Sequence, residues 1–317
     1  MMFIARRWIS RQKHQFLKKN TRNRARLKIL EIIVLVFLST LWLLMWSSPS
    51  LFYGLIQALR IENAVPLIIV ITPTYMRPER LGDLTRLSNT LRLVPHVYWI
   101  VVEDGNSTNP LVEGILNRTN HRFTYLSGIT PKGYNHRGWY QRSLAITYLR
   151  KNAERITRYY RTAVVYFADD DNSYDTRVFT DYIRNVRKLG MWAVGLSGGR
   201  YVEYPVAVNG TVIFNAWTPK RTFAIDMAGF AINLEYILAS SAVFGKHCPR
   251  GYEAPETCFL EDLGFKRTDI EVFGDKNEEG PNDVLVWHTK TILGSYKMPP
   301  NETVPYAYET PRTNTKK

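Results

Sequence analysis

Three consecutive carboxylates, Asp169, Asp170 and Asp171, directly follow the apolar run at residues 164–168. The β-branched and aromatic residues of that run predict a buried strand. A charged carboxylate is costly to bury without a partner, so the aspartates should lie at the open end of the strand. Ligands of open α/β sheets bind at the carboxyl ends of strands. Hard oxygen donors there predict a Mg²⁺ or Mn²⁺ site that also holds phosphate.

Other roles of this acidic run can be compared with a metal site. A calcium loop of the EF-hand type would need Gly and Glu where the chain has Tyr174 and Thr180, so that role is excluded. A phosphatase-type nucleophile at Asp169 remains an alternative, because a carboxylate can accept a phosphoryl group. The alternative without catalytic function is an Asp-rich turn that caps a helix beginning near Tyr174.

Alternating strand and helix patterns precede the aspartates. Apolar runs at residues 65–72 and 96–102 predict strands, and residues 80–91 and 141–160 have helical spacing. Together with the strand that leads to Asp169, this β-α-β-α-β order predicts an α/β fold with a parallel, nucleotide-binding sheet.

Phosphate binding in such a sheet would need cations. No Walker loop and no G-x-G-x-x-G follows the first predicted strand, which speaks against P-loop enzymes and Rossmann dehydrogenases. The metal and basic side chains would then hold the phosphate. The candidate basic residues are Arg137, Arg142, His288 and Lys290.

The second half of the chain has residues suited to sugar recognition. Trp217 and Arg221 precede an apolar run at residues 223–231 that holds a single acid, Asp226. Aromatic stacking and polar hydrogen bonds together suit a sugar, whereas core packing would explain the aromatic residues but not the acid. The pair Asn209–Gly210 predicts a hairpin turn just before this region.

A predicted helix at residues 254–263 carries a candidate base. Pro255 suits the first turn of a helix, and Glu256 is expected at its exposed start. A carboxylate there could act as a general base, but glutamate is also favoured at helix N-termini by the helix dipole. A final strand is predicted at residues 284–289, which include His288.

Net charge indicates where the chain is basic. The formal charge is +14, but ten of the 42 Lys and Arg residues lie within residues 1–28, which hold no acid. Residues 29–317 therefore carry 32 basic and 28 acidic residues. The basic excess is a tail and not a binding face, so we expect no nucleic-acid partner.

The tail is followed by a predicted membrane span. Residues 32–46 are apolar apart from Ser39 and Thr40, and the uncharged stretch continues to Leu59. That length is enough for a transmembrane helix and too long for a signal-peptide core. The positive-inside rule places the tail in the cytosol and the main domain in the lumen. The predicted parts are a cytoplasmic tail at 1–28, a signal anchor at 29–48 and a stem at 49–64.

Two further features fit a lumenal domain. Cys248 and Cys258 are the only cysteines and could form a disulfide in an oxidising compartment, with a free buried pair as the alternative. Glycosylation sequons begin at Asn106, Asn117, Asn209 and Asn301.

Taken together, the ordered motifs resemble those of the animal β-1,3-glucuronosyltransferases, glycosyltransferase family 43. The matching segments are ITPTY at 71–75, VED at 102–104, QR at 141–142, FADDDN at 167–172, GGR at 198–200, FAIDMAGFA at 223–231 and VLVWHT at 284–289. The basic tail, anchor and stem match this family as well. The segments cover nearly the whole predicted lumenal domain.

This resemblance implies a fold and a reaction. It implies a GT-A fold, with a Rossmann-like nucleotide-sugar half at residues 65–190, an acceptor-binding half at 191–300 and a C-terminal tail at 301–317. It also implies a type II protein of the Golgi membrane that forms a homodimer, binds UDP-glucuronic acid with Mn²⁺ and inverts the anomeric centre. The acceptor would be the 3-hydroxyl of a terminal galactose.

The resemblance also assigns roles to single residues. Asp171 would bind the metal and Glu256 would be the catalytic base. The donor-binding residues would be Pro73, Thr74, Tyr75, Asp104, Arg137, Arg142, Asp169, Asp170, His288 and Lys290. The acceptor contacts would be Glu203, Trp217, Arg221 and Asp226. Lys290 stands where this family usually has Arg, which keeps the charge but loses the planar fork. Cys258 stands where a polar residue is usual.

The acceptor is expected to be the galactose-galactose-xylose linkage region of proteoglycans. Terminal N-acetyllactosamine on glycoproteins is the alternative within the same enzyme class. An inactive lumenal sugar-binding relative is the alternative from another class, and the intact carboxylates argue against it.

Overall fold

The computed structural model describes residues 28, 32–40, 42–43, 46–47, 65–275, 282–289 and 291. The chain divides into two compact units, Met1–Ile61 and Glu62–Lys317. In the first unit, residues 32–40 are helical. Across the described residues, no helix is both long and apolar enough to cross a membrane. The predicted stem and C-terminal tail, Lys290 and Asn301, and nearly all of the basic tail lie outside the described residues.

A seven-stranded sheet forms the centre of the second unit, in the order β11-β6-β10-β4-β1-β2-β3. Four adjacent strands of it pair in parallel: β1 (Leu67–Thr74), β2 (Val97–Glu103), β3 (Arg122–Ser127) and β4 (Ala163–Phe167). The three central ones are almost fully buried, as expected of strands covered on both faces. The predicted parallel α/β sheet is confirmed. Strand β3 was missed because it is half-exposed and lacks a continuous apolar run.

Strand β10 brings the second half of the chain into this sheet. It lies antiparallel between β4 and β6, and β11 continues the sheet beyond β6. These strands are β6 (Leu189–Met191), β10 (Phe230–Asn233) and β11 (Ile270–Val272). Because β10 runs against β4, the residues just before Phe230 lie beside the carboxyl end of β4. Asp226 thereby comes close to the acidic run.

A smaller sheet has the order β5-β12-β7-β8-β9. Its strands are β5 (Ser173–Tyr174), β7 (Val194–Gly195), β8 (Val202–Val208), β9 (Thr211–Asn215) and β12 (Val286–Trp287). The predicted hairpin between β8 and β9 is confirmed, and Asn209 and Gly210 both have positive φ, as a type I′ turn requires. The final strand is shorter than predicted.

Strand β5 overturns the helix-cap interpretation of the aspartates. Ser173–Tyr174 pair with β12, and the next helical turn is a π-helix at Val178–Tyr182. That turn begins after Arg177, which makes no side-chain capping bond. The acidic run therefore caps no helix at this position.

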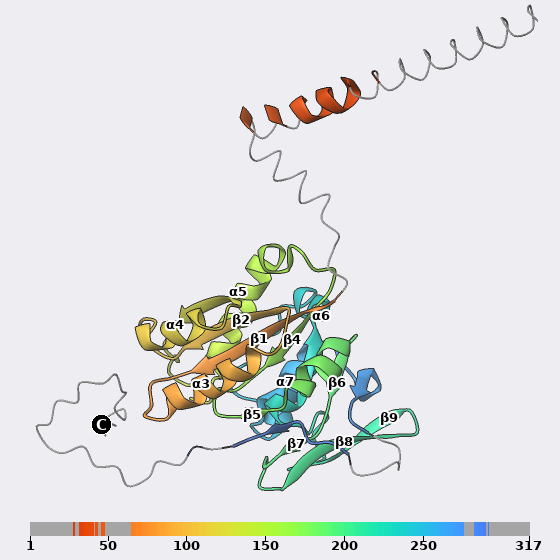
Figure 1. The fold of residues 1–317 in the computed structure, drawn as a ribbon. Coiled ribbons are helices and arrows are strands. Elements are labelled where there is room, and N and C mark those ends of the chain that lie inside the picture. The colour runs from red at the N-terminus through yellow and green to blue at the C-terminus, as the bar shows by residue number, and fades with distance from the viewer. Residues whose placement is uncertain are drawn as a thin grey trace, which may run out of the picture. The chain divides into compact units, whose positions relative to one another are not determined.

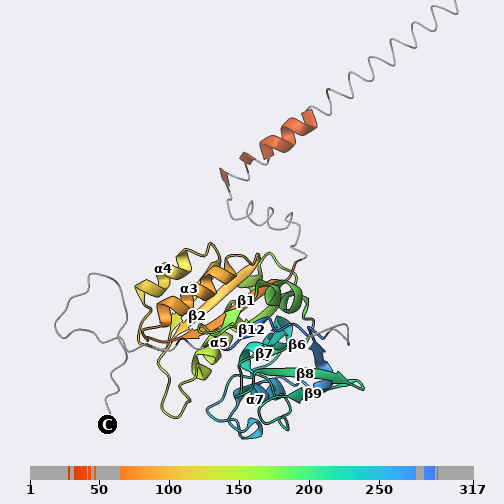
Figure 2. The same cartoon turned by 60° about the horizontal axis from the view of Figure 1, so that its bottom comes forward.

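Helices cover both faces of the main sheet (Figures 1 and 2). Leucines of α3 and apolar residues of α4 pack on one face, and α5 packs on the other. The helices are α3 (Arg80–Leu91), α4 (Pro110–Asn117), α5 (Trp139–Thr157), α6 (Leu234–Leu238) and α7 (Pro255–Asp262). Helix α3 agrees with its predicted range, whereas α5 begins two residues earlier than predicted and ends three earlier.

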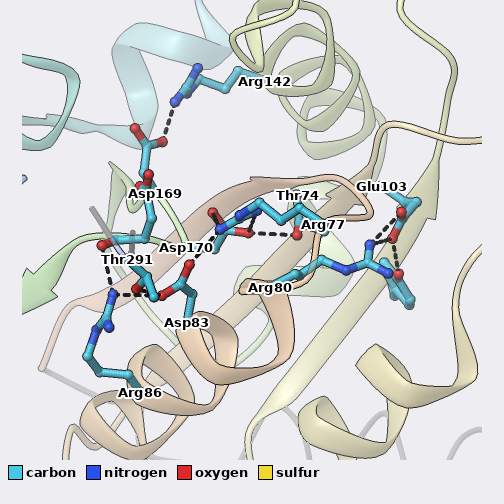
Figure 3. A network of polar contacts seen from close by, with 12 residues as sticks. Thr74, Arg77, Arg80, Asp83, Arg86, Glu103, Arg142, Asp169, Asp170 and Thr291 are labelled. Carbon is cyan, nitrogen blue, oxygen red and sulfur yellow. Dashed lines mark hydrogen bonds and ion pairs between the residues drawn. The ribbon is translucent and has the colours of Figure 1, made fainter. Parts of the chain in front are cut away.

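A buried ion pair ties the start of α3 to the end of β2. Arg80 is fully buried, and its Nη1 lies 2.5 and 2.6 Å from the two carboxylate oxygens of Glu103. The Tyr125 hydroxyl of β3 donates a third bond to Glu103, at 2.5 Å. Figure 3 shows the ion pair. These contacts hold α3 at the sheet edge where β1 and β2 end.

Replacement of Glu103 by Gln should lower the free energy of unfolding by about 3–5 kcal/mol, because Arg80 would keep a buried charge without its counter-charge. Chemical denaturation measures this loss. The matched control is Glu113→Gln on the exposed surface of α4, with an expected change below about 0.5 kcal/mol. Equal effects of the two substitutions would contradict the importance of this ion pair.

Candidate active site

A cavity of about 1250 Å³ opens at the carboxyl ends of β1, β2 and β4. It brings together predicted residues from both halves of the chain. The predicted site residues that line it are Pro73, Thr74, Tyr75, Asp104, Arg137, Arg142, Asp169, Asp170, Asp171, Glu203, Trp217, Arg221, Asp226, Glu256 and His288. Lys290, the remaining predicted site residue, is outside the described residues.

Asp170 is held by an arginine that the sequence interpretation missed. Arg77 donates to both of its carboxylate oxygens at 2.9 Å, and the Thr74 hydroxyl donates at 2.7 Å. Arg77 also bonds Asp83 of α3 at 2.9 Å (Figure 3). Burial raises the pKa of Asp170, and the charge of Arg77 opposes that shift. No spacing pattern marks Arg77, because its partner lies 93 positions along the chain.

Asp169 points to the other side of the strand end. Its carboxylate pairs with Arg142 of α5 (Figure 3). The Arg142 guanidinium also donates to the carbonyl of Arg137 at 2.8 Å. Gly138, at the start of this helix, has φ 75°, and a Cβ there would lie 2.8 Å from the Pro73 side chain and 2.9 Å from Arg142. Glycine is therefore required for β1 and α5 to approach each other.

Asp171 is left facing the cavity. Among the described residues, its carboxylate makes no hydrogen bond or ion pair, although its backbone carbonyl accepts bonds from Arg86 at 2.7 Å and Thr289 at 2.9 Å. Burial, reinforced by the charges of Asp169 and Asp170, raises the pKa of Asp171 to about 6. A cation beside this carboxylate would relieve that repulsion.

The donor set at Asp171 fits an ion that also binds phosphate. The described part of the chain has no cluster of three His, Cys, Asp or Glu side chains that could hold a metal. Mg²⁺-type ions, however, are commonly held by one or two carboxylates together with substrate phosphates and water. A single unpaired carboxylate beside basic side chains is compatible with that mode.

His288 supplies a positive charge to the cavity. Its Nδ1 lies 3.4 Å from Asp226, and that hydrogen bond raises the pKa of His288 to about 9. The same Asp226 oxygen accepts from Ser197 at 2.8 Å, and the other accepts from the Ala228 backbone at 2.9 Å. Burial opposes ionisation of Asp226, but the bond from His288 prevails and lowers its pKa. At neutral pH the pair is an imidazolium and a carboxylate.

Glu256 is buried, contrary to the expectation of an exposed helix start. It lies in the first turn of α7, and this turn forms part of the cavity wall instead of facing bulk solvent. Arg221 Nη1 is 3.7 Å from its Oε2, and this oxygen has no hydrogen-bond partner among the described residues. Burial raises the pKa of Glu256 to about 7, so the carboxyl can take up or release a proton near neutral pH.

The other residues predicted to contact the acceptor are organised around Glu203. It is buried and accepts from the Trp217 backbone at 2.6 Å and from the Ser197 hydroxyl at 3.2 Å. Arg221 lies over the Trp217 ring, 5.1 Å from its centroid. The Trp217 side chain is 44% exposed, so part of its ring surface is open to a ligand.

On the opposite wall, Asp104 follows β2. Its Oδ1 accepts from the Thr130 backbone at 2.9 Å, and its Oδ2 lies 3.5 Å from His136. Its backbone N–H donates to the Thr74 carbonyl at 2.8 Å, which joins the ends of β1 and β2. His136 also lines the cavity and was not predicted.

Cys248 and Cys258 form a disulfide, which decides between the two alternatives. Asn106, Asn117 and Asn209 of the glycosylation sequons are exposed.

Fold and site together define an α/β enzyme whose cavity lies where parallel strands end, the place at which such sheets bind nucleotides. The chain belongs to glycosyltransferase family 43, whose profile matches residues 87–292. This confirms the predicted family and the glycosyltransferase class.

Named relatives agree with this membership. Galactosylgalactosylxylosylprotein 3-beta-glucuronosyltransferase I of Drosophila melanogaster is 37% identical over 281 residues, which cover 82% of this chain and 88% of that protein. The corresponding sqv-8 protein of Caenorhabditis elegans is 39% identical over 246 residues, covering 73% and 66%. Galactosylgalactosylxylosylprotein 3-beta-glucuronosyltransferase 3 of Mus musculus is 39% identical over 248 residues, which cover 72% of this chain and 72% of that protein.

A solved structure is similar at a lower level. TarS residues 1–349 of S. aureus has a TM-score of 0.45 and 17% identity, and the match covers 70% of this chain and 60% of that one. A likeness of this size supports no conclusion about ligand or activity.

The raised pKa of Glu256 has a consequence for stability. The folded state holds this proton up to about pH 7, whereas the unfolded carboxyl loses it near its ordinary value of 4.5. Folding stability therefore falls as pH rises between these values. The Glu256→Gln side chain does not titrate, so the stability of this variant lacks that pH dependence. The free energy of unfolding of the variant, relative to that of wild type, should therefore rise between about pH 5 and about pH 8. Urea denaturation across that range measures the difference, and a constant difference would contradict the raised pKa.

Proposed function

We propose that this chain is an inverting, metal-dependent glucuronosyltransferase. It transfers glucuronic acid from UDP-glucuronate to the 3-hydroxyl of the terminal galactose in the Gal-Gal-Xyl linkage region of proteoglycans. Family membership and the names of the relatives support this substrate class. The structural observation that carries it is one cavity that holds two carboxyls without a hydrogen-bonded protein partner among the described residues, Asp171 and Glu256 Oε2, each suited to a different task.

The nucleotide would lie at the ends of β1 and β2. Pro73, Thr74, Tyr75 and Asp104 would form the uracil pocket, because they surround the point at which the two strands end. Asp169 and Asp170 would face uridine and ribose. Since Asp170 is already bonded by Arg77 and Thr74, its main contribution is to fix the shape of this wall.

The diphosphate and the glucuronate carboxylate need positive charge. Arg137, Arg142, His288 and Lys290 would supply it. Asp226 keeps His288 protonated at neutral pH, and Asp169 keeps Arg142 aimed at the cavity. Asp171 would hold Mn²⁺, which supplies Lewis-acid neutralisation of charge on the departing UDP.

Glu256 would act as the general base. With a pKa of about 7, a large fraction of the carboxyl is ionised at neutral pH and still basic enough to accept a proton. It would take the proton of the galactose 3-hydroxyl while the hydroxyl oxygen bonds to the anomeric carbon and the bond to UDP breaks. Attack opposite the leaving group inverts the anomeric centre. Arg221 at 3.7 Å would hold the carboxylate after proton release.

The other acceptor-side residues would orient the galactose. Trp217 offers a partly exposed ring for the sugar face. Glu203 and Asp226 already accept bonds from the protein, so they would position Trp217 and His288 as well as contact sugar hydroxyls.

We assign the chain to the GT-A fold type, as a homodimer anchored in the Golgi membrane with type II topology. The anchor would be residues 29–48, and the catalytic unit would comprise the halves 65–190 and 191–300. The disulfide supports an oxidising lumenal compartment. The exposed Asn106, Asn117 and Asn209 are compatible with glycosylation there.

Purified protein should transfer labelled glucuronate from UDP-glucuronate to a Gal-Gal-Xyl acceptor in the presence of Mn²⁺. The Glu256→Gln variant should lose about 10²- to 10⁴-fold in rate, because it keeps the shape of the side chain but cannot accept the proton. Chromatography of the labelled product measures both rates.

The matched control is Glu154→Gln, an exposed glutamate of α5, which should transfer at the wild-type rate. Transfer to N-acetyllactosamine in preference to Gal-Gal-Xyl would replace the proposed acceptor. Full transfer by Glu256→Gln would exclude Glu256 as the base.

Replacement of Asp171 by Asn should weaken Mn²⁺ binding in the presence of UDP by at least about tenfold, because the amide lacks the charge that holds the ion. Electron paramagnetic resonance titration of free Mn²⁺ measures the affinity without any need for turnover. Asp181→Asn, at an exposed position, is the control. Unchanged Mn²⁺ affinity in Asp171→Asn would move the ion to another ligand.

A further inference from the structure

The disulfide closes a loop that forms one wall of the cavity. Cys248 is almost fully buried and bonds Cys258, in the middle of α7. Between them, five consecutive residues line the cavity: Tyr252, Glu253, Ala254, Pro255 and Glu256. The loop therefore carries both the proposed base and an aromatic side chain to which the proposed mechanism assigns no role.

The backbone of this loop is held in a conformation that L-residues rarely adopt. Tyr252 and Glu253 have φ of 52° and 64°, and left-handed residues of this kind persist only where surrounding contacts enforce them. The Glu253 N–H donates to the Cys248 carbonyl at 2.9 Å, and the Tyr252 N–H donates to that of Pro249 at 3.1 Å. A Cβ on Gly251 would lie 2.7 Å from the Cys248 sulfur, so the backbone packs directly against the disulfide.

This conformation places the Tyr252 ring on the cavity wall. The side chain is 58% exposed, although the loop around it is anchored in the core by Cys248. Within the described part of the chain, Tyr252 makes no side-chain hydrogen bond and no ring contact. The surrounding contacts thus maintain a strained backbone that presents an aromatic surface, and this surface has no partner among the residues that the structure describes.

We propose that Tyr252 forms an acceptor subsite, where its ring stacks on the apolar face of a sugar of the acceptor glycan. This rests on the proposed function. The acceptor is favoured over the donor because the same closed loop supplies Glu256, which must touch the attacking hydroxyl. The residues proposed for the nucleotide come instead from the ends of β1, β2 and β4. An aromatic ring offers a sugar both an apolar face and, in tyrosine, a hydroxyl at its edge.

Tyr252→Ala should raise the KM for Gal-Gal-Xyl roughly three- to tenfold, the effect expected from loss of one aromatic stacking contact. The KM for UDP-glucuronate and kcat should stay within about twofold of wild type, because the ring does not touch the reacting atoms. Tyr252→Phe keeps the ring and should retain most of the acceptor affinity. Steady-state kinetics with each substrate varied in turn measure these values.

The matched control is Tyr201→Ala, since Tyr201 is 90% exposed but does not line the cavity. It should leave both KM values unchanged. An unchanged acceptor KM in Tyr252→Ala would overturn the subsite. A rise confined to the KM for UDP-glucuronate would also overturn it, because the ring would then contact the donor.

A binding measurement separates this proposal from the proposed reaction. Saturation-transfer NMR of the Gal-Gal-Xyl trisaccharide with UDP present reports acceptor contact without turnover. Loss of the signal in Tyr252→Ala would support the subsite even if no glucuronate were transferred by wild type. Wild-type transfer together with an unchanged signal in Tyr252→Ala would leave the reaction intact and exclude the subsite.

Opening the loop gives a second test. The double variant Cys248→Ser, Cys258→Ser should raise the acceptor KM at least as much as Tyr252→Ala and should also lower kcat, because Tyr252 and Glu256 lose the same constraint. Circular dichroism checks that the variant is folded. A folded double variant with wild-type acceptor KM would contradict the role of the disulfide in presenting Tyr252.

Discussion

The bridge made by Arg77 between Asp170 and Asp83 is the contact on which the site depends. Three adjacent carboxylates repel one another, and a buried unpaired one would strongly destabilise the fold. Arg77 compensates Asp170 and joins the ends of β1 and β4 to helix α3. Arg142 of α5 then pairs with Asp169 from the opposite side. Because both neighbours are paired, Asp171 alone of the three faces the cavity without a partner, which suits the cation-binding role proposed for it.

The far wall of the cavity depends on an antiparallel strand. Strand β10 runs antiparallel to β4, and this orientation places Asp226, just before β10, next to His288 and near the acidic run. Helix α7 and its disulfide add Glu256 from a distant part of the chain. The surroundings then shift the pKa values of these two carboxyls in opposite directions. Hydrogen bonding lowers the pKa of Asp226, while burial raises that of Glu256 to about 7. One cavity can thus hold a permanent anion and a proton acceptor.

Local patterns and ordered motifs could predict much of this protein. The apolar runs predicted the central parallel strands, the leucine spacing predicted α3, and Asn209–Gly210 predicted its hairpin. Strand β3 was not predicted because its side chains are half-exposed. Strand β5 was not predicted because a strand of two residues is too short to show an alternation of apolar and polar side chains. Most of the described candidate site residues were found from their type and their place at strand ends or a helix start. The family resemblance added Pro73, Thr74, Tyr75, Asp104 and Glu203, and all of them line one cavity. Arg77 was missed because its partner is remote in sequence.

By itself, the sequence determined which residue types stand at each strand end, the α/β class and the family, since these follow from local pattern and motif order. Only the tertiary structure decided how the three aspartates differ, that Glu256 is buried, that the two cysteines are bonded and that Tyr252 faces the cavity. These properties depend on which distant groups meet and how much water they exclude. Burial and charge pairing arise between elements, so no single segment of the chain encodes them alone.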